Sequence, residues 1–194
     1  MAKEVERFIQ RGAFEYKRIN FVGYSLGGVI IRAGLRHLSA YKDRMNLLIT
    51  LASPHLGISK IDNFLVNVGV WYMITFDKVK SLSELNHNDE QNTMLKLSRD
   101  ESLGWFTKVV VTSSKEDNFV PNYSARIEPH NSEPFAMEAY NNIVRIAKEI
   151  VRIDVWFDSQ GSTFDKMIGR KSHIEFLESD GFSELFFKLF GNLL

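Results

Sequence analysis

The fold expected for this chain of 194 residues is decided by one stretch, Gly23-Tyr24-Ser25-Leu26-Gly27-Gly28. The short apolar segment Arg18–Val22 precedes it, and Gly27–Leu38, with apolar residues at helical spacing, follows it. A G-x-S-x-G sequence between a strand and a helix is typical of a sharp turn that projects the serine from the carboxyl end of a parallel sheet. The alternative interpretation is a glycine-rich turn with an incidental serine.

The chemistry of such a turn explains the residue types at its other positions. The serine takes a strained backbone conformation, and we expect Gly23 and Gly27 to leave room where side chains would collide with the turn. The turn also directs the backbone N–H of Leu26, near the start of the helix, toward an oxyanion that develops when the serine attacks a carbonyl group. The stretch therefore predicts Ser25 as a nucleophile.

The rest of the chain alternates between segments typical of strands and of helices, and no repeat is found. This alternation predicts a single α/β domain over residues 1–194, with a mostly parallel sheet of about four strands flanked by helices. The other expected strands are Asn46–Leu51, Lys108–Thr112 and the half-exposed Val151–Phe157 near a sheet edge. The other expected helices are Lys3–Gln10, Ala136–Ile150 and a final helix with Ser183 as its N-cap.

Residues 58–106 depart from this regularity and predict a helical cap insertion. Its apolar part, Phe64–Phe76, is interpreted either as a lid over an acyl pocket or as an ordinary buried helix. As a lid it would allow peripheral contact with a lipid surface.

A serine nucleophile needs a base, and in folds with this turn the chain order is serine, acid, histidine. Of five histidines, only His173 follows the last expected strand, in a loop leading toward a helix. His55 follows the strand Asn46–Leu51, so we expect it at the mouth of the site, although it precedes the favoured acid. The others lie in a helix, in the insertion and in a loop: His37, His87 and His130.

The acid is expected directly after a strand. Asp117 follows the strand Lys108–Thr112 and precedes a turn that ends at Pro121, which would fix the loop against the sheet. Glu116 is the neighbouring alternative, and Asp62 is another if the acid follows an earlier strand. We favour Asp117.

Composition excludes several other classes of function. Lys+Arg and Asp+Glu both number 24, so charge gives no reason to expect nucleic acid as a partner. The chain has no cysteine, no metal-ligand spacing and no phosphate-binding loop, so we expect neither a metal nor another cofactor. With neither a signal peptide nor a membrane span in the sequence, we expect a cytoplasmic protein.

The chain resembles the lipase-like serine esterases of the α/β-hydrolase superfamily, in particular those that form C-terminal lipase-like domains of large proteins. The resemblance covers nearly the whole chain and rests on four motifs, at residues 21–32, 53–57, 124–128 and 168–174. It implies a serine hydrolase acting on lipid or other acyl esters. It also places Ser25, Asp117 and His173 at the positions of that family's triad.

One departure from a whole hydrolase is visible in the sequence. Only 24 residues precede Ser25, whereas such hydrolases have further strands upstream, one of whose loops supplies a second oxyanion N–H. We therefore expect a partial α/β-hydrolase with an open edge at its first strand, either part of a longer protein or an N-terminally truncated product.

The main alternative to an ester hydrolase is a weak or inactive fragment that serves as an interaction domain. Transfer of the acyl group to another alcohol would use the same acyl-enzyme.

Overall fold

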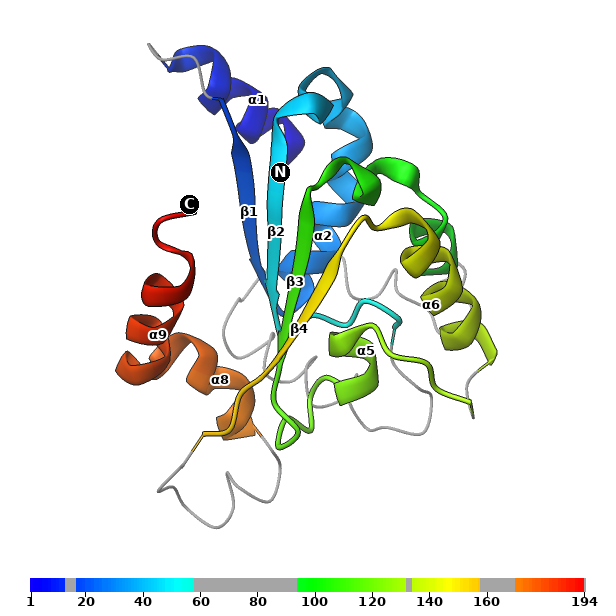
Figure 1. Cartoon of the computed structure of the whole chain (residues 1–194), viewed down its shortest axis with the longest axis vertical. Helices are drawn as coiled ribbons and strands as arrows, with labels where there is room; N and C mark the ends of the chain where they lie inside the picture. Colours follow the sequence, from blue (N-terminus) through cyan, green and yellow to red (C-terminus); the bar gives the residue numbers. More distant parts are fainter. Residues whose placement is uncertain (13–16, 58–93, 132–133, 158–169, 194) are drawn as a thin grey trace, which may run out of the picture.

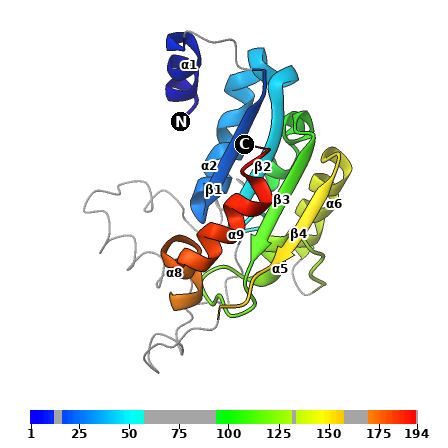
Figure 2. The same ribbon diagram turned by 60° about the vertical axis from the view of Figure 1, so that its left-hand side comes forward.

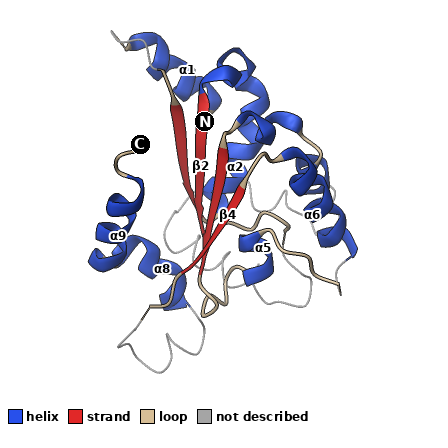
Figure 3. Ribbon diagram, in the orientation of Figure 1, coloured by secondary structure: helices blue, strands red, loops and turns tan. Residues whose placement is uncertain are grey.

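A computed structural model describes residues 1–12, 17–57, 94–131, 134–157 and 170–193. Its centre is a sheet of four parallel strands in the order β1-β2-β3-β4. The strands are β1 (Ile19–Tyr24), β2 (Met45–Leu51), β3 (Lys108–Ser113) and β4 (Ile150–Asp154) (Figures 1 and 3). The predicted α/β class with about four parallel strands is therefore confirmed.

The two central strands are buried and the two outer ones are not. In β2 and β3 nearly every residue is buried, whereas every residue of β4 is only partly buried. This difference follows from position, because an inner strand of a parallel sheet is covered on both faces and on both sides. β4 is thus the predicted edge strand, and β1 pairs with β2 alone among the strands that the structure describes.

Helices cover both faces of the sheet (Figure 2). One face carries α2 (Leu26–Leu35), the 3-10 segments η1 (Arg36–Arg44) and η2 (Glu101–Trp105), and α6 (Pro134–Ile146). The other face carries α8 (Arg170–Glu178) and α9 (Asp180–Phe190), whose Phe176 and Phe182 pack on Leu47, Ile49 and Val110. The alternation of side chains along each strand divides the apolar residues between two cores, one on each face.

The remaining helices lie at the two ends of the sheet. α1 (Ala2–Arg11) packs Ala2 and Val5 against the core on the α2 face, near the amino end of β1. α5 (Asn122–Arg126) lies near the carboxyl ends of the strands, in the lower part of Figure 1. The polar composition of Asp117–Pro134 predicts a loop, and this prediction is wrong for the five residues of α5.

Several helix boundaries differ from those expected. The helix expected over Ala136–Ile150 runs from Pro134 to Ile146, and Ile150 is instead the first residue of β4. The helix after β1 ends at Leu35 and continues as the 3-10 segment η1, with Leu38 in a non-helical conformation. The N-cap of α9 is Ser179, whose side chain accepts a hydrogen bond from the Phe182 N–H, so the expected cap at Ser183 is wrong. Most of the expected insertion lies outside the described residues, while 94–98 are helical and Phe106 is fully buried.

No helix in the part of the chain that the structure describes is both long and apolar enough to cross a membrane.

The carboxyl ends of β1, β2 and β3 are level with one another, because Tyr24, Leu51 and Thr112 are register partners. The segments that leave these three strands therefore start side by side; the first carries Ser25 and the third carries Asp117.

Candidate active site

Ser25 lies at the turn between β1 and α2. Its backbone has φ 52° and ψ −127°, a positive φ that residues with a side chain rarely adopt. The Ser25 N–H donates a hydrogen bond of 2.8 Å to the Leu51 carbonyl at the end of β2, so the neighbouring strand holds the strained turn. The Ser25 side chain emerges from this turn at the carboxyl end of the sheet, as predicted.

The glycines of the turn do not all have the role expected of them. A Cβ atom on Gly23 would lie 2.7 Å from backbone atoms of Gly28, and one on Gly28 would lie 2.4 Å from the Ser53 Oγ atom. A Cβ on Gly27 would meet nothing within 4 Å. The steric reason proposed for Gly23 is therefore right, and the one proposed for Gly27 is wrong. Gly28 is the second position where a side chain does not fit.

His173 and Ser25 meet across the end of the sheet. The Nε2 atom of His173 lies 3.1 Å from the Ser25 Oγ atom, and its Nδ1 atom lies 2.7 Å from the Asp117 Oδ2 atom. His173 is 1% exposed and Asp117 is 6% exposed, so both interactions are shielded from bulk water. The structure thus brings together the three residues singled out in the sequence. It places His173 in α8, however, and not in a loop before a helix.

The Asp117 carboxylate is fixed by the loop that carries it. Its Oδ1 atom accepts hydrogen bonds from the N–H groups of Phe119, at 2.7 Å, and Val120, at 3.1 Å. The Oδ2 atom is left to face His173. Glu116, the neighbouring alternative, is exposed, and Asp62 lies outside the described residues.

This arrangement determines the tautomer of a neutral His173. A carboxylate only accepts hydrogen bonds, so the proton of the ring is on Nδ1 and points to Asp117. Nε2 then carries a lone pair and accepts the hydrogen bond from the Ser25 hydroxyl. A general base for Ser25 requires this orientation.

Two aromatic rings lie against the His173 imidazole. The centroid of the Tyr24 ring lies 5.0 Å from the centroid of the imidazole. The centroid of the Phe119 ring lies 5.5 Å from it, in an edge-on arrangement. The Tyr24 hydroxyl also donates a hydrogen bond of 3.0 Å to the His173 carbonyl. Burial raises the pKa of Tyr24 above its usual range, and the charges of Asp117 and Glu178 add to this effect. In the sequence, Tyr24 could have been singled out only by its position directly before Ser25.

His55 does not lie at the mouth of the site, so that expectation was wrong. It is fully buried, and its Nε2 atom lies 2.8 Å from the Thr50 Oγ1 atom. Its Nδ1 atom lies 3.3 Å from Nη1 of Arg32, which also donates to the His55 carbonyl at 3.0 Å. The guanidinium can only donate, so Nδ1 accepts and the neutral ring donates from Nε2 to Thr50. Burial, together with the charge of Arg32, holds the pKa of His55 well below 6.5.

Arg32 is a buried cation that the sequence analysis missed. It is 2% exposed, and burial lowers its pKa to about 10, so it stays charged at neutral pH. Its guanidinium binds the His55 carbonyl and the Leu97 carbonyl. The buried residues of α2 are Gly28, Ile31, Arg32 and Leu35, which is the spacing of one helix face. That spacing was the available signal, because it places Arg32 on the apolar stripe.

Two other histidines have no part in the geometry around Ser25. His37 is exposed beside Arg36, and His130 stacks on Tyr123 with ring centroids 4.0 Å apart. His87 lies outside the described residues. No group of three or more His, Cys, Asp or Glu side chains in the described ranges is placed to hold a metal ion.

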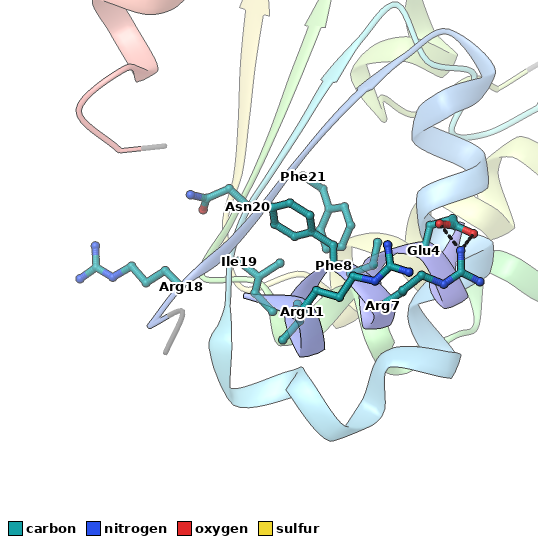
Figure 4. A pocket seen from close by; sticks show the side chains of 10 residues that line it. Glu4, Arg7, Phe8, Arg11, Arg18, Ile19, Asn20 and Phe21 are labelled. Carbon is teal, nitrogen blue, oxygen red and sulfur yellow. Dashed lines mark hydrogen bonds and ion pairs between the residues drawn. The ribbon is translucent and has the colours of Figure 1, made fainter. Parts of the chain in front are cut away.

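A hollow of about 610 Å³ lies between α1 and β1 (Figure 4). Phe8, Ile19 and Phe21 line its apolar part, and the arginines Arg7, Arg11 and Arg18 also line it. Arg7 binds both oxygens of Glu4, at 2.6 and 2.7 Å. The lining contains neither Ser25, Asp117 nor His173, so this hollow is separate from the site.

Comparison with solved structures gives distant likenesses. The chain is similar to an acylaminoacyl peptidase in complex with Z-Gly-Gly-Phe-chloromethyl ketone, with 16% identity and a TM-score of 0.45 over 90% of this chain and 25% of that one. It is similar to a bromoperoxidase from Bacillus anthracis, with 10% identity and a TM-score of 0.38 over 79% and 64%. It is similar to acetyl xylan esterase 1 from Thermoanaerobacterium sp., with 15% identity and a TM-score of 0.39 over 91% and 51%. The chain therefore spans less than two thirds of the length of each of these proteins.

A family model gives a more direct result. The model described as "Putative serine esterase (DUF676)" matches residues 1–132 of the 194. The match covers more than half of the chain and includes the turn at Ser25 and the loop with Asp117. The chain therefore belongs to this serine esterase family.

Proposed function

We propose that this chain is a serine hydrolase that cleaves carboxylic esters through an acyl-enzyme on Ser25. One observation carries the proposal: the Ser25 hydroxyl, the His173 imidazole and the Asp117 carboxylate form a continuous line of hydrogen bonds, with distances of 3.1 and 2.7 Å. Membership of a serine esterase family supports the same conclusion. In this proposal Ser25 is the nucleophile, His173 is the general base and Asp117 orients the imidazole.

In the first half of the reaction, Ser25 Oγ attacks the carbonyl carbon of the ester while its proton moves to His173 Nε2. Asp117 stays ionised and stabilises the imidazolium that forms. The negative charge on the former carbonyl oxygen is stabilised by the Leu26 N–H, which belongs to the first turn of α2 and has no partner inside that helix. The bond to the alcohol then breaks, and the alcohol leaves with the proton from Nε2.

The second half repeats these steps with water. His173 Nε2 takes a proton from the water, whose oxygen attacks the acyl carbon. The bond between that carbon and Ser25 Oγ then breaks, and Oγ recovers a proton from Nε2. The carboxylic acid is released and the starting protonation state is restored. Both halves require the same tautomer of His173, which the Asp117 carboxylate favours.

We propose lipid acyl esters as the substrate class. The support is the resemblance to lipase-like esterases and the apolar segment Phe64–Phe76, which lies outside the described residues. Contact of this segment with a lipid surface is part of the proposal. A series of p-nitrophenyl esters from acetate to palmitate tests it: hydrolysis should favour long chains. A preference for acetate would reject the lipid substrate and leave the esterase proposal in place.

A fluorophosphonate probe tests the hydrolase proposal itself. The purified chain and its S25A variant are incubated with the probe, and the labelled peptide is mapped by mass spectrometry. We expect labelling of the wild type at Ser25 and none in S25A.

Folded wild-type protein that remains unlabelled would contradict the proposal. It would favour the alternative of an interaction domain, for which the specific observation is the position of β1 at the edge of the described sheet.

A further inference from the structure

We infer that Tyr24 is a positioning residue for His173, and this inference rests on the function proposed for Ser25. Tyr24 is the last residue of β1 and directly precedes Ser25. Its hydroxyl donates to the His173 carbonyl at 3.0 Å, and its ring lies 5.0 Å from the imidazole. The backbone that carries the nucleophile therefore also holds the backbone that carries the base.

The need for such a contact follows from where His173 lies. It belongs to α8, which follows β4 only after residues 158–169, whereas Ser25 lies at the end of β1. In the described part of the chain, β1 and β4 are the outermost strands of the sheet and do not pair with each other. The interaction of Nε2 with the Ser25 Oγ atom at 3.1 Å depends on contacts made by side chains. A displacement of about 1 Å at a reacting pair costs on the order of 100-fold in rate.

The hydroxyl and the ring of Tyr24 act on different parts of His173. A carbonyl oxygen only accepts hydrogen bonds, so the Tyr24 hydroxyl is the donor and fixes the main chain of α8. The tilted ring, with the Phe119 ring 5.5 Å away from the same imidazole, restricts the rotation of the side chain. Phe119 comes from the loop that carries Asp117. Each partner of His173 thus lies within two residues of an aromatic residue that contacts the imidazole.

A purely structural role for Tyr24 predicts different behaviour. Tyr24 also packs against the core under α8 and α9, so loss of its ring would destabilise the fold whatever happens at Ser25. The Y24F variant keeps the ring and removes only the hydrogen bond. Tyr41 provides a matched control, because it is partly buried against the core on the opposite face. The Y41F variant removes a hydroxyl of the same kind far from His173.

The experiment compares wild type, Y24F, Y24L and Y41F. The rate of fluorophosphonate labelling is measured across pH, thermal unfolding is recorded, and the proton on His173 Nδ1 is followed by its downfield NMR signal. In Y24F we expect labelling to slow about tenfold, as for loss of one hydrogen bond in the reacting geometry, with little change in unfolding. The downfield signal should broaden or disappear, and Y41F should match the wild type. Y24L should lose further rate because it also loses the ring.

The two proposals fail in different ways. Y24F with the wild-type rate, pH profile and NMR signal would overturn the inference about Tyr24 while leaving the hydrolase intact. A wild type that is not labelled at Ser25 would overturn the hydrolase. The NMR comparison would then still decide whether the Tyr24 hydroxyl holds His173.

Discussion

The Nε2 atom of His173 and the Oγ atom of Ser25 lie 3.1 Å apart, although the two residues are 148 positions apart in the chain. Ser25 reaches this place through a strained turn with φ 52°, and His173 reaches it from a helix on the other face of the sheet from α2. The Asp117 carboxylate, 2.7 Å from Nδ1, completes the line. The following predictions test the parts of this arrangement separately.

Replacement of Asp117 by Asn should abolish most of the reactivity of Ser25 without unfolding the protein. The asparagine Oδ1 atom can still accept from Phe119 and Val120, so the loop is retained. Its NH2 group would donate to Nδ1 and move the ring proton to Nε2, where it blocks proton transfer. We expect D117N to lower the rate of fluorophosphonate labelling by on the order of 10⁴. The exposed neighbour gives the control, and E116Q should label like the wild type. Equal rates for D117N and wild type would exclude Asp117 from this role.

The strained backbone at Ser25 should cost stability, and glycine should recover it. Glycine adopts a positive φ without the steric penalty that a Cβ atom brings. S25G and S25A both remove the nucleophile, but only S25G removes the strain. We expect S25G to have a free energy of unfolding about 1 kcal/mol higher than that of S25A, measured in urea. Equal midpoints for the two variants would mean that the turn at residue 25 is not strained.

The three glycines of the turn should respond differently to alanine. The added Cβ in G23A and G28A would lie 2.7 and 2.4 Å from neighbouring atoms, so the turn must shift in each. We expect each variant to lose about 1–3 kcal/mol of stability, as for other overpacked sites. G27A meets no atom within 4 Å and lies in the first turn of α2, so it should lose none. The denaturation midpoints of the three variants give the comparison, and a loss in G27A as large as in G23A would contradict the packing described.

Stability should fall as the pH decreases below about 6.5, with His55 as one cause. Burial keeps His55 neutral in the folded state, while the unfolded chain binds a proton there below its ordinary pKa of 6.5. The unfolded state therefore binds more protons in this range, and acid favours it. His55 should contribute about 1.4 kcal/mol per pH unit from its ordinary pKa down to its lowered one.

Urea unfolding of wild type and H55Q at several pH values measures this contribution. H55Q should have a flatter dependence on pH than the wild type, whatever its absolute stability. Identical slopes for H55Q and wild type would exclude His55 as a source of acid sensitivity.

The sequence was sufficient for β2 and β3 because their apolar runs are continuous, and for β4 because apolar and polar residues alternate along it. It also singled out three residues that the structure brings together. It was less informative at helix ends, where local signals compete. Ser179 and Ser183 are both good N-cap residues and lie one turn apart. Helix α9 begins at Asp180, and the side chain of Ser179 is the one that accepts a hydrogen bond from its first turn. His173 lies in a helix because Phe176, three residues later, buries its ring against the sheet.

The surroundings of the site could not be predicted from the sequence, because they depend on contacts between residues that are far apart in the chain. Arginine is mostly exposed in proteins, and Arg32 is buried because the carbonyls of His55 and Leu97 meet it from distant segments. The same contacts draw His55 into the interior and away from the mouth of the site. Gly27 looked constrained from its place in the motif, yet the tight approach is between Gly23 and Gly28. These relationships arise only when the helix after β1 packs on the loop after β2.

The separation of Ser25 from His173 along the chain also has a consequence for biosynthesis. Translation proceeds from the amino end, so the strained turn at Ser25 is made before the imidazole of His173 is added. A nascent or prematurely terminated product that stops before residue 173 carries the serine without the group that would deprotonate it. Under the proposed function, Ser25 therefore becomes reactive only after residue 173 has been added to the chain.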